Sequence, residues 1–397
     1  SEVTTTGFLG FFSVLYRGCV EAADVIFMIL CCCGTFGVVV KTGAFHAGIG
    51  TILKKLKGKE ILLVPIIMMI FGLGGSVFGM ASEFYGFYPL IVGLGVALGY
   101  DAMFGFAIIA VGEFVGFMGA TLNPYSVGIA QTISGVELYS GTGYRAICFV
   151  IFMAISIIYV MVYGRKIKKN PGASVVFGEK NIHAFDRDEL NEYSFTLKDG
   201  LVVLMLGLIK WGWDFPQLCG LFLLMSMIAA AICKWSPNKW CSEFIDSAKT
   251  AMWGCILTGI AKAITVVMQD AQIMDTVIYG LSNVLKNAPH AVSAQVMLVV
   301  QTLINFFIPS ATGQASATMP IMAQLADIIG VSRQTAVLAF QFGDGLSNIF
   351  WPTADIVIIC GLGGISLQKW YKWFTPLFLI LFVTQAILLG IATGIGF

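Results

Sequence analysis

Long apolar runs alternate with short polar stretches along nearly the whole chain, and this pattern predicts helices that cross or enter a membrane. A helix needs about 20 mostly apolar residues to span a bilayer. Residues 1–19 are mixed and aromatic, which favours an approach along the membrane interface, and 275–286 is amphipathic. The predicted membrane segments are 20–40, 61–78, 88–98, 102–120, 144–163, 201–213, 218–233, 248–268, 292–309, 319–329, 335–347 and 374–395. We therefore expect an all-α polytopic membrane protein.

The composition supports a membrane location and excludes some partners. Of the 397 residues, 58% are hydrophobic and 11% are charged, whereas a soluble domain carries about 25% charge. A surface this apolar must face lipid. The net charge is +1 with no basic domain, so we expect no nucleic-acid partner. The ten cysteines show neither a CxxC pair nor zinc-like Cys/His spacing, so we expect no metal centre.

Two of the predicted spans are interrupted by polar segments that contain proline, and two apolar hairpins turn at polar tips. Backbone groups exposed to lipid at such places would each cost several kcal/mol, so breaks and tips must line a cavity or bind a ligand. Transporters place their binding sites at discontinuous helices of this kind. The breaks lie at Asn123-Pro124 and at 348–353, and the tips at 79–83 and 310–316.

The two halves of the chain carry the same features in the same order: a span, an amphipathic stretch, a polar-tipped hairpin, a broken span and a final span. Pro89 and Pro320 are separated by the same number of residues as Glu113 and Asp344, each of which follows a glycine. Identity between the halves is weak, so the order of features carries the argument. The predicted divisions are 1–164 for a first repeat, 165–197 for a linker and 198–397 for a second repeat.

Basic residues cluster at four places, and the positive-inside rule assigns such clusters to the cytoplasm. Arg165 to Lys169 opens the longest polar stretch, so the linker 165–197 is expected to be cytoplasmic. All four clusters fall on one side of the membrane only if the two hairpins enter it from opposite faces. The halves are therefore predicted to be inverted repeats. The other clusters are Lys54 to Lys59, Lys234 with Lys239, and Lys369 with Lys372.

Several motifs at the tips and breaks resemble those of a known carrier family. They are Gly79-Met80-Ala81-Ser82-Glu83, Phe87-Tyr88-Pro89-Leu90, Leu122-Asn123-Pro124-Tyr125, Ile308-Pro309-Ser310-Ala311-Thr312-Gly313-Gln314, Gln341-Phe342-Gly343-Asp344-Gly345 and Trp351-Pro352-Thr353. Together they are similar to the YfcC-like carriers, which belong with the DcuC-type C4-dicarboxylate carriers of the ion transporter superfamily. The resemblance extends over nearly the whole chain.

The resemblance implies an elevator-type mechanism, in which two hairpins and two broken helices slide as a transport domain against a scaffold that also forms a homodimer. It implies a multi-pass protein in the lipid of a bacterial inner membrane, with substrate and coupling cation at the tips and breaks. It further implies one more membrane helix ahead of the first predicted span. Where the family pattern has two adjacent acids in the first tip, this chain has Ser82-Glu83.

The polar residues of the tips and breaks are the candidates for substrate binding. A charge at mid-membrane costs about 3 kcal/mol or more unless it is paired or hydrated, so Glu83 indicates either a substrate or proton contact or a structural ion pair. Neutral oxygen donors suit Na⁺ or a substrate carboxylate, or else they cap broken helix ends. The candidate substrate-binding residues are Ser82, Glu83, Asn123, Ser310, Thr312, Gln314, Asn348 and Thr353.

A second set of residues is predicted to couple transport to Na⁺ or H⁺, without a cofactor. Glu113 and Asp344 are matched acids on the two broken spans, and the alternative role for them is a hydrogen-bonded contact between helices. Asp355 lies one turn beyond Trp351-Pro352. The candidate coupling residues are Glu113, Asp344, Asp355 and Thr121.

Inverted repeats with polar hairpins favour a secondary active transporter over an enzyme or a passive channel. No HExxH or GxSxG motif occurs, and Gln341 stands where an intramembrane aspartyl protease would have glycine ahead of Gly343-Asp344. The acids of the predicted site have no nearby Arg, which favours a basic amino acid such as arginine or ornithine, moved by antiport or ion coupling. The YfcC-like resemblance points the same way. The alternative is a Na⁺-coupled C4-dicarboxylate transporter that uses helix dipoles.

Overall fold

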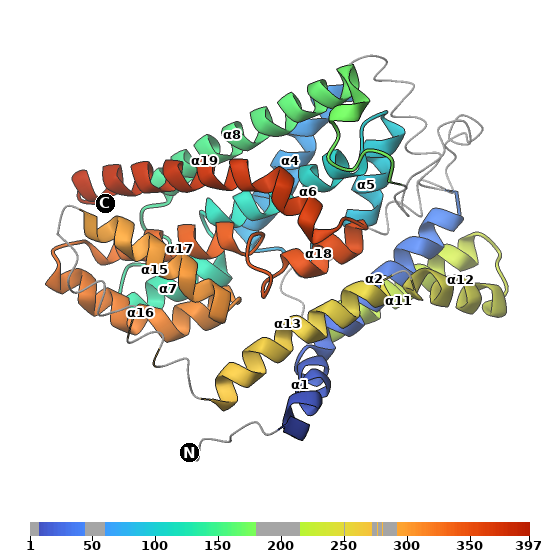
Figure 1. Cartoon of the computed structure of the whole chain (residues 1–397), viewed down its shortest axis with the longest axis horizontal. Coiled ribbons are helices and arrows are strands. Elements are labelled where there is room, and N and C mark those ends of the chain that lie inside the picture. Colours follow the sequence, from blue (N-terminus) through green and yellow to red (C-terminus); the bar gives the residue numbers. More distant parts are fainter. Residues whose placement is uncertain are drawn as a thin grey trace.

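The computed structural model describes residues 8–43, 60–179, 215–249, 251–271 and 292–397, together with positions 276 and 280. All regular elements within these ranges are helical, which confirms the all-α part of the predicted fold class. Figure 1 shows the helices in two groups, a long arm that crosses below a larger bundle in this view.

The arm is built from two segments that are distant in the sequence. Its helices are α1 (Phe8–Glu21), α2 (Ala23–Lys41), α11 (Phe215–Ile232), α12 (Pro237–Lys249) and α13 (Met252–Asp270). Helix α1 packs along α13, and α2 packs along α11 and α12 (Figure 1). Each helix of the N-terminal segment is therefore held by helices from the second half of the chain.

Glycine lets the arm helices approach closely at two places. A Cβ at Gly18 of α1 would lie 2.4 Å from the carbonyl oxygen of Gly259 on α13. A Cβ at Gly37 of α2 would lie 2.0 Å from Oγ of Ser247 on α12. Both distances are far below van der Waals contact, so a larger residue at either position would force the helices apart.

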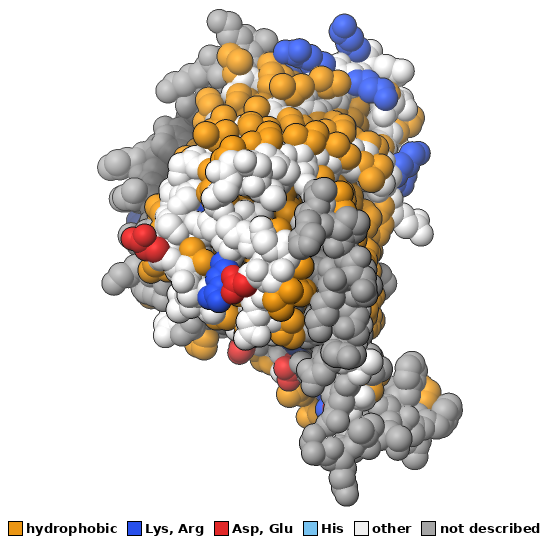
Figure 2. Space-filling view, turned by 90° about the vertical axis from the view of Figure 1, so that its left-hand side faces the viewer, with side chains coloured by type: hydrophobic (Ala, Val, Ile, Leu, Met, Phe, Trp, Pro, Cys, Tyr) orange, Lys and Arg blue, Asp and Glu red, His pale blue; other side chains and the backbone are white. Residues whose placement is uncertain are grey.

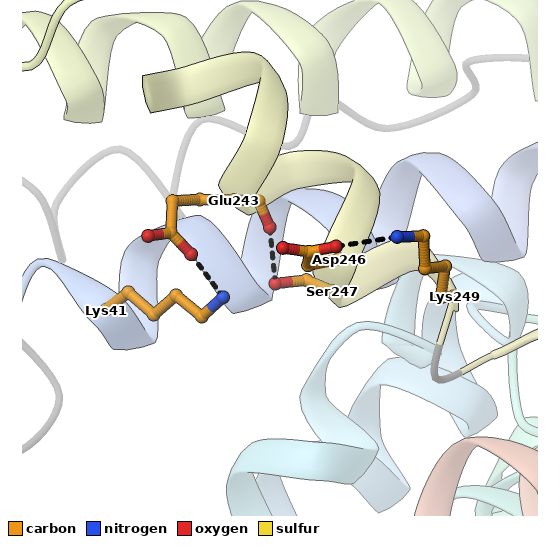
Figure 3. Close-up of polar contacts among 5 residues, drawn as sticks. All are labelled: Lys41, Glu243, Asp246, Ser247 and Lys249. Carbon is orange, nitrogen blue, oxygen red and sulfur yellow. Dashed lines mark hydrogen bonds and ion pairs between the residues drawn. The ribbon is translucent and has the colours of Figure 1, made fainter. Parts of the chain in front are cut away.

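Ion pairs add to this packing at both ends of the arm. Arg17 on α1 pairs with Asp270 on α13, and Lys41 on α2 pairs with Glu243 on α12 (Figure 3). Exposed ion pairs contribute about 0–1 kcal/mol each. The two pairs therefore add little to the stability of the arm.

Two helical hairpins belong to the bundle, and both legs of each hairpin pack against one central helix. The first hairpin comprises η1 (Glu60–Leu62), α4 (Leu63–Leu73), η2 (Gly74–Phe78), η3 (Ser82–Phe84) and α5 (Phe87–Ala97). The second comprises α15 (Ser293–Phe307) and α16 (Ala311–Ile328). The legs α4 and α5 contact α6 (Ala102–Met118), and the legs α15 and α16 contact α17 (Arg333–Ser347).

Both central helices end at the predicted breaks. Helix α6 is followed by η4 (Pro124–Gly128) and α7 (Ile129–Ser134), and α17 is followed by α18 (Ile356–Gly363). The remaining elements of the bundle are α8 (Thr142–Lys169), η5 (Pro171–Ala173) and α19 (Leu367–Gly394). Helices α8 and α19 lie side by side along one edge (Figure 1). The arm meets the bundle where α13 contacts α18 and where α2 contacts α5.

The central helices of the two halves cross inside the bundle. Every residue of α6 is buried, which is the pattern of a core helix. A Cβ at Gly345 of α17 would lie 2.4 Å from the backbone nitrogen of Met118, so the two backbones touch. Gln341 Nε2 donates to the carbonyls of Met118 at 2.9 Å and Ala120 at 2.8 Å. The open carbonyls at the end of α6 are thus satisfied by a side chain from the other half.

Some helix boundaries differ from the predicted ones. Residues of 1–19 that were expected only to approach the membrane form α1 from Phe8 onward. Helix α8 continues to Lys169, so the basic cluster occupies its last turns. Helix α16 begins at Ala311, within the predicted polar tip, because Ser310 caps it by accepting from the Gly313 amide at 3.3 Å. The predicted span 201–213, most of 275–286 and linker residues 180–197 lie outside the described residues.

The apolar helices fit a membrane protein. Helices α2, α8 and α19 are long and apolar enough to cross a bilayer. Other apolar helices, among them α6 and α15, have only 10–17 residues, as hairpin legs and broken spans do. Figure 2 shows hydrophobic side chains over broad areas of one face, with most of the visible Lys and Arg along its upper edge. Apolar areas of this extent suit contact with lipid.

Candidate substrate and ion site

In the first half, the helix break is tied to the hairpin of the same half. Asn123 Nδ2 donates to the carbonyl of Gly75 at 3.2 Å. The Thr121 amide donates to the carbonyl of Ser76 at 2.9 Å, and the hydroxyls of Thr121 and Ser76 lie 3.2 Å apart. Asn123 Oδ1 also accepts from the Tyr125 amide at 2.9 Å, so it caps the helix that resumes after the break.

In the second half, an equivalent set of bonds ties the break to its own hairpin. Thr353 Oγ1 donates to the carbonyl of Phe306 at 2.6 Å. Asn305 Nδ2 lies 2.9 Å from Asn348 Oδ1 and 3.2 Å from Asp344 Oδ1. Asn305 is buried, and its Oδ1 has no hydrogen-bond partner among the described residues. The side chain of Asn305, the carboxylate of Asp344 and the side-chain oxygen of Asn348 therefore meet at one buried position.

Each hairpin tip also contacts the break of the opposite half. Tyr85 in the first tip donates to Asp355 Oδ1, beyond the second break, at 3.0 Å. Thr312 in the second tip donates to the carbonyl of Tyr125, beyond the first break, at 3.2 Å. Each tip is thus in contact with the segment that follows the break of the other half.

The matched acids of the two central helices are both buried, with different partners. Glu113 accepts from the Tyr88 hydroxyl at 2.8 Å through Oε2, while its Oε1 has no hydrogen-bond partner in the part of the chain that the structure describes. Asp344 accepts from the amide of Asn305.

No described Lys or Arg pairs with these acids. The ion pairs in the described ranges lie elsewhere, in the arm or at the ends of bundle helices. Glu83 is half-buried, and its Oε2 accepts from the Ala81 amide at 3.0 Å and from the Ser82 hydroxyl at 3.5 Å. The structural ion pair considered for Glu83 is therefore absent among the described residues.

The other candidates from the second tip divide into two groups. Ser310 and Thr312 are exposed at the tip. Gln314 is buried one turn further on, and its Nε2 donates to the backbone carbonyl of Gln301 at 2.9 Å and to its side-chain oxygen at 2.7 Å. Gln314 therefore holds the two legs of the second hairpin together, whereas its counterpart Glu83 lies in the tip itself.

Sequence reasoning missed three residues of this cluster. Tyr85 and Tyr88 lie among apolar neighbours of the first tip, and an aromatic residue in such a stretch is ordinarily interpreted as a core residue. Only the fold brings their hydroxyls to Asp355 and Glu113. Asn305 carried a usable signal, because an amide inside the apolar run 292–309 is costly without a partner.

A helical protein with apolar surfaces, two polar-tipped hairpins and two broken helices that meet at a buried polar cluster is a membrane transporter by class. The sequence profile of the C4-dicarboxylate anaerobic carriers, DcuC, matches residues 2–394. The chain belongs to this family, as a YfcC-like member of the DcuC-type carriers. Members of the family are transporters and not enzymes, and they move small molecules.

Two relatives and one solved structure are similar to this chain. A protein of Escherichia coli K12 named "Putative basic amino acid antiporter YfcC" is 33% identical, over 95% of this chain and 78% of the relative. An uncharacterized protein of Haemophilus influenzae Rd is 30% identical, over 96% of this chain and 77% of the relative. The crystal structure of the YdaH transporter of Alcanivorax borkumensis matches with a TM-score of 0.50 at 14% identity, over 100% of this chain and 90% of that one. The last match establishes a shared fold.

Proposed function

We propose that this protein is a secondary active transporter that exchanges basic amino acids of the arginine or ornithine type. The observation that carries the proposal is the set of buried or half-buried acids at the tips and broken helices without a described basic partner. Buried charges need an opposite charge or hydrogen-bond donors. A guanidinium or ammonium group of the substrate would supply it. The acids are Glu83, Glu113, Asp344 and Asp355.

The relatives support this choice without deciding it. The Escherichia coli relative carries a basic amino acid antiporter in its name, whereas the family description names C4-dicarboxylates. Recognition of two carboxylates usually recruits Arg side chains or paired helix N-termini. A cluster of acids would repel a dicarboxylate unless bound cations offset the charge. Na⁺-coupled C4-dicarboxylate transport is therefore the second candidate.

The neutral residues of the site would recognise the α-amino and α-carboxyl groups. Two of them contact an acid directly, because Ser82 donates to Glu83 and Asn348 donates to Asp344. The other hydroxyl and amide groups at the tips and breaks belong to Asn123, Ser310, Thr312 and Thr353. Thr312 and Ser310 are exposed at the second tip, where a solute could reach them. Gln314 would act indirectly, by fixing the leg that carries this tip.

Coupling to an ion would use the two central helices. Glu113 has one buried carboxyl oxygen without a described partner, which suits a proton-binding group. Asp344 Oδ1 and Asn348 Oδ1 both accept from the side-chain amide of Asn305, whose own buried Oδ1 has no described partner. Three side-chain oxygens at one place would suit Na⁺. Thr121 and Asp355 complete the proposed coupling set at the two breaks.

We further propose an elevator mechanism in inverted repeats, with 1–164 and 198–397 as the repeats and 165–197 as the linker. In each half, both legs of the hairpin pack against the central helix of that half, α6 or α17, and this shared arrangement supports the repeats. The arm would be the scaffold, because it meets the bundle chiefly through α13 with α18 and α2 with α5. The scaffold would also form a homodimer. The location would be a bacterial inner membrane, with the basic end of α8 and the linker in the cytoplasm.

Transport by the purified protein in liposomes tests the function. Vesicles loaded with unlabelled arginine, ornithine, succinate or fumarate are given the labelled form of each solute outside. We expect rapid labelled-arginine uptake into arginine- or ornithine-loaded vesicles and slow uptake into empty ones. Exchange of succinate and fumarate without exchange of arginine or ornithine would reject the amino-acid proposal in favour of the second candidate.

A further inference from the structure

A fully buried arginine lies at the start of α8, away from the acids of the proposed site. Arg145 is 0% exposed, and its Nε and Nη1 have no hydrogen-bond partner among the described residues. Its Nη2 lies 3.4 Å from Oε1 of Gln334, a long contact. The Phe397 ring covers the guanidinium, with its centroid 5.8 Å from Cζ. No described acid pairs with this charge.

The backbone around Arg145 adds to its positive potential. Helix α8 begins at Thr142 after Gly141, with neither a side-chain cap nor an acid in its first turn. No side chain of the described residues therefore caps its first N–H groups, and the positive end of the helix dipole lies at the turn that carries Arg145. The first turn of α17, which carries Gln334, also has no acid.

Neutral groups already use the nearby acceptors. Gln131 and Gln334 are bonded to each other at 3.1 Å, Gln131 also accepts from the Tyr139 amide at 2.6 Å, and Gln334 donates to the carbonyl of Ser140 at 2.6 Å. The neighbouring Arg333 is not short of partners, because its guanidinium contacts both oxygens of Asp327. Of these two neighbouring arginines, Arg145 is therefore the one without an acid among the described residues.

We propose that Arg145 and the N-terminus of α8 form a binding site for a phosphate-type oxyanion, separate from the transported substrate. The oxyanion is either free phosphate or the headgroup of an anionic phospholipid. Guanidinium N–H groups bind phosphate oxygens strongly, and open N–H groups of a helix N-terminus supply further donors. Because Arg145 is 0% exposed and the Phe397 ring covers it, the anion would enter only if this ring moved aside. The site does not depend on which solute the protein transports.

Thermal unfolding of the purified protein tests the site. Inorganic phosphate is compared with chloride at equal ionic strength, and nanodiscs of phosphatidylglycerol are compared with nanodiscs of phosphatidylcholine. Phosphate or phosphatidylglycerol is expected to raise Tm by about 2 °C or more, since a ligand stabilises the state that binds it. A response to the lipid alone identifies the headgroup as the source, and a response to phosphate identifies the free ion.

Variants separate this site from general effects of charge. The shift should vanish in Arg145→Gln and persist in the matched variant Arg333→Gln, which removes a nearby arginine that already has an acid. If Arg145→Gln does not fold, Arg145→Lys keeps the charge without the planar fork, and phosphate should then bind at least about tenfold more weakly. The proposal is wrong if neither anion shifts wild-type Tm, or if the shift is unchanged in the Arg145 variant.

Discussion

The hydroxyl of Tyr85, in the tip of the first hairpin, donates a hydrogen bond to Asp355, just beyond the break of the second half, at 3.0 Å. Thr312 makes the reciprocal contact, from the second tip to the carbonyl of Tyr125. Each tip therefore depends on the other half for a polar partner. Neither contact can form in one half alone, so these two links between tip and break need both halves folded together.

Removing the Tyr85 hydroxyl tests the first of these contacts. Hydrogen bonds to a charged group contribute about 1.5–3 kcal/mol, so Tyr85→Phe should lower transport by about tenfold or more while the helical content is retained. The measurement is solute exchange in liposomes together with circular dichroism. Tyr159→Phe is the matched control, because that hydroxyl donates to the carbonyl of Trp373 between α8 and α19. Equal losses in both variants would mean that any lost tyrosine hydroxyl has this effect.

The charge of Glu83 tests the proposed substrate contact. Glu83→Gln keeps the shape and the acceptor for the Ala81 amide but removes the negative charge. We expect transport to be abolished or its solute preference to change, with Tm within a few degrees of wild type. Glu137→Gln serves as a control, since that side chain is exposed after α7. Wild-type uptake by the Glu83 variant would remove Glu83 from the site.

Ion coupling should depend differently on the two matched acids. Glu113→Gln still accepts a bond from Tyr88 but cannot release a proton, so uptake driven by a pH gradient should stop while exchange at equal pH continues. Asp344→Asn should instead weaken any dependence on Na⁺, because a carboxylate ligand is lost. The measurement is solute uptake by each variant, driven separately by a pH gradient and by a Na⁺ gradient at fixed membrane potential. An unchanged response to pH in Glu113→Gln would remove that residue from coupling.

Close packing of the arm predicts a substitution that a second substitution rescues. Gly37→Ala places a methyl group 2.0 Å from Oγ and 2.1 Å from Cβ of Ser247, and overpacking costs about 1–3 kcal/mol. Tm should fall accordingly. Adding Ser247→Gly removes both clashing atoms and should restore most of the loss. Gly220→Ala, also in an arm helix, has open space around its Cβ and should leave Tm unchanged or slightly raised. Failure of Ser247→Gly to rescue would mean that the helices do not meet at this pair.

Much of the helical framework follows from local pattern. The apolar runs predicted α4, α5, α6, α15 and α17 nearly to their observed ends, because burial in lipid or in a helical core demands continuous apolar sequence. Asn123-Pro124 predicted the end of α6 because proline cannot continue a helix and asparagine caps the next one. The end of α8 was misplaced, because lysines at a helix end continue the helix while they interact with its dipole.

The sequence by itself determined that this protein is an all-helical membrane protein with two hairpins, two broken spans and acids at matched positions, because hydropathy, proline and capping act over a few neighbouring residues. Only the tertiary structure decided which groups meet: Tyr85 with Asp355, Tyr88 with Glu113, and Asn305 with Asp344. It alone also left Arg145 buried without a described acid. Such pairings depend on how helices from distant parts of the chain cross, and no local pattern encodes that geometry.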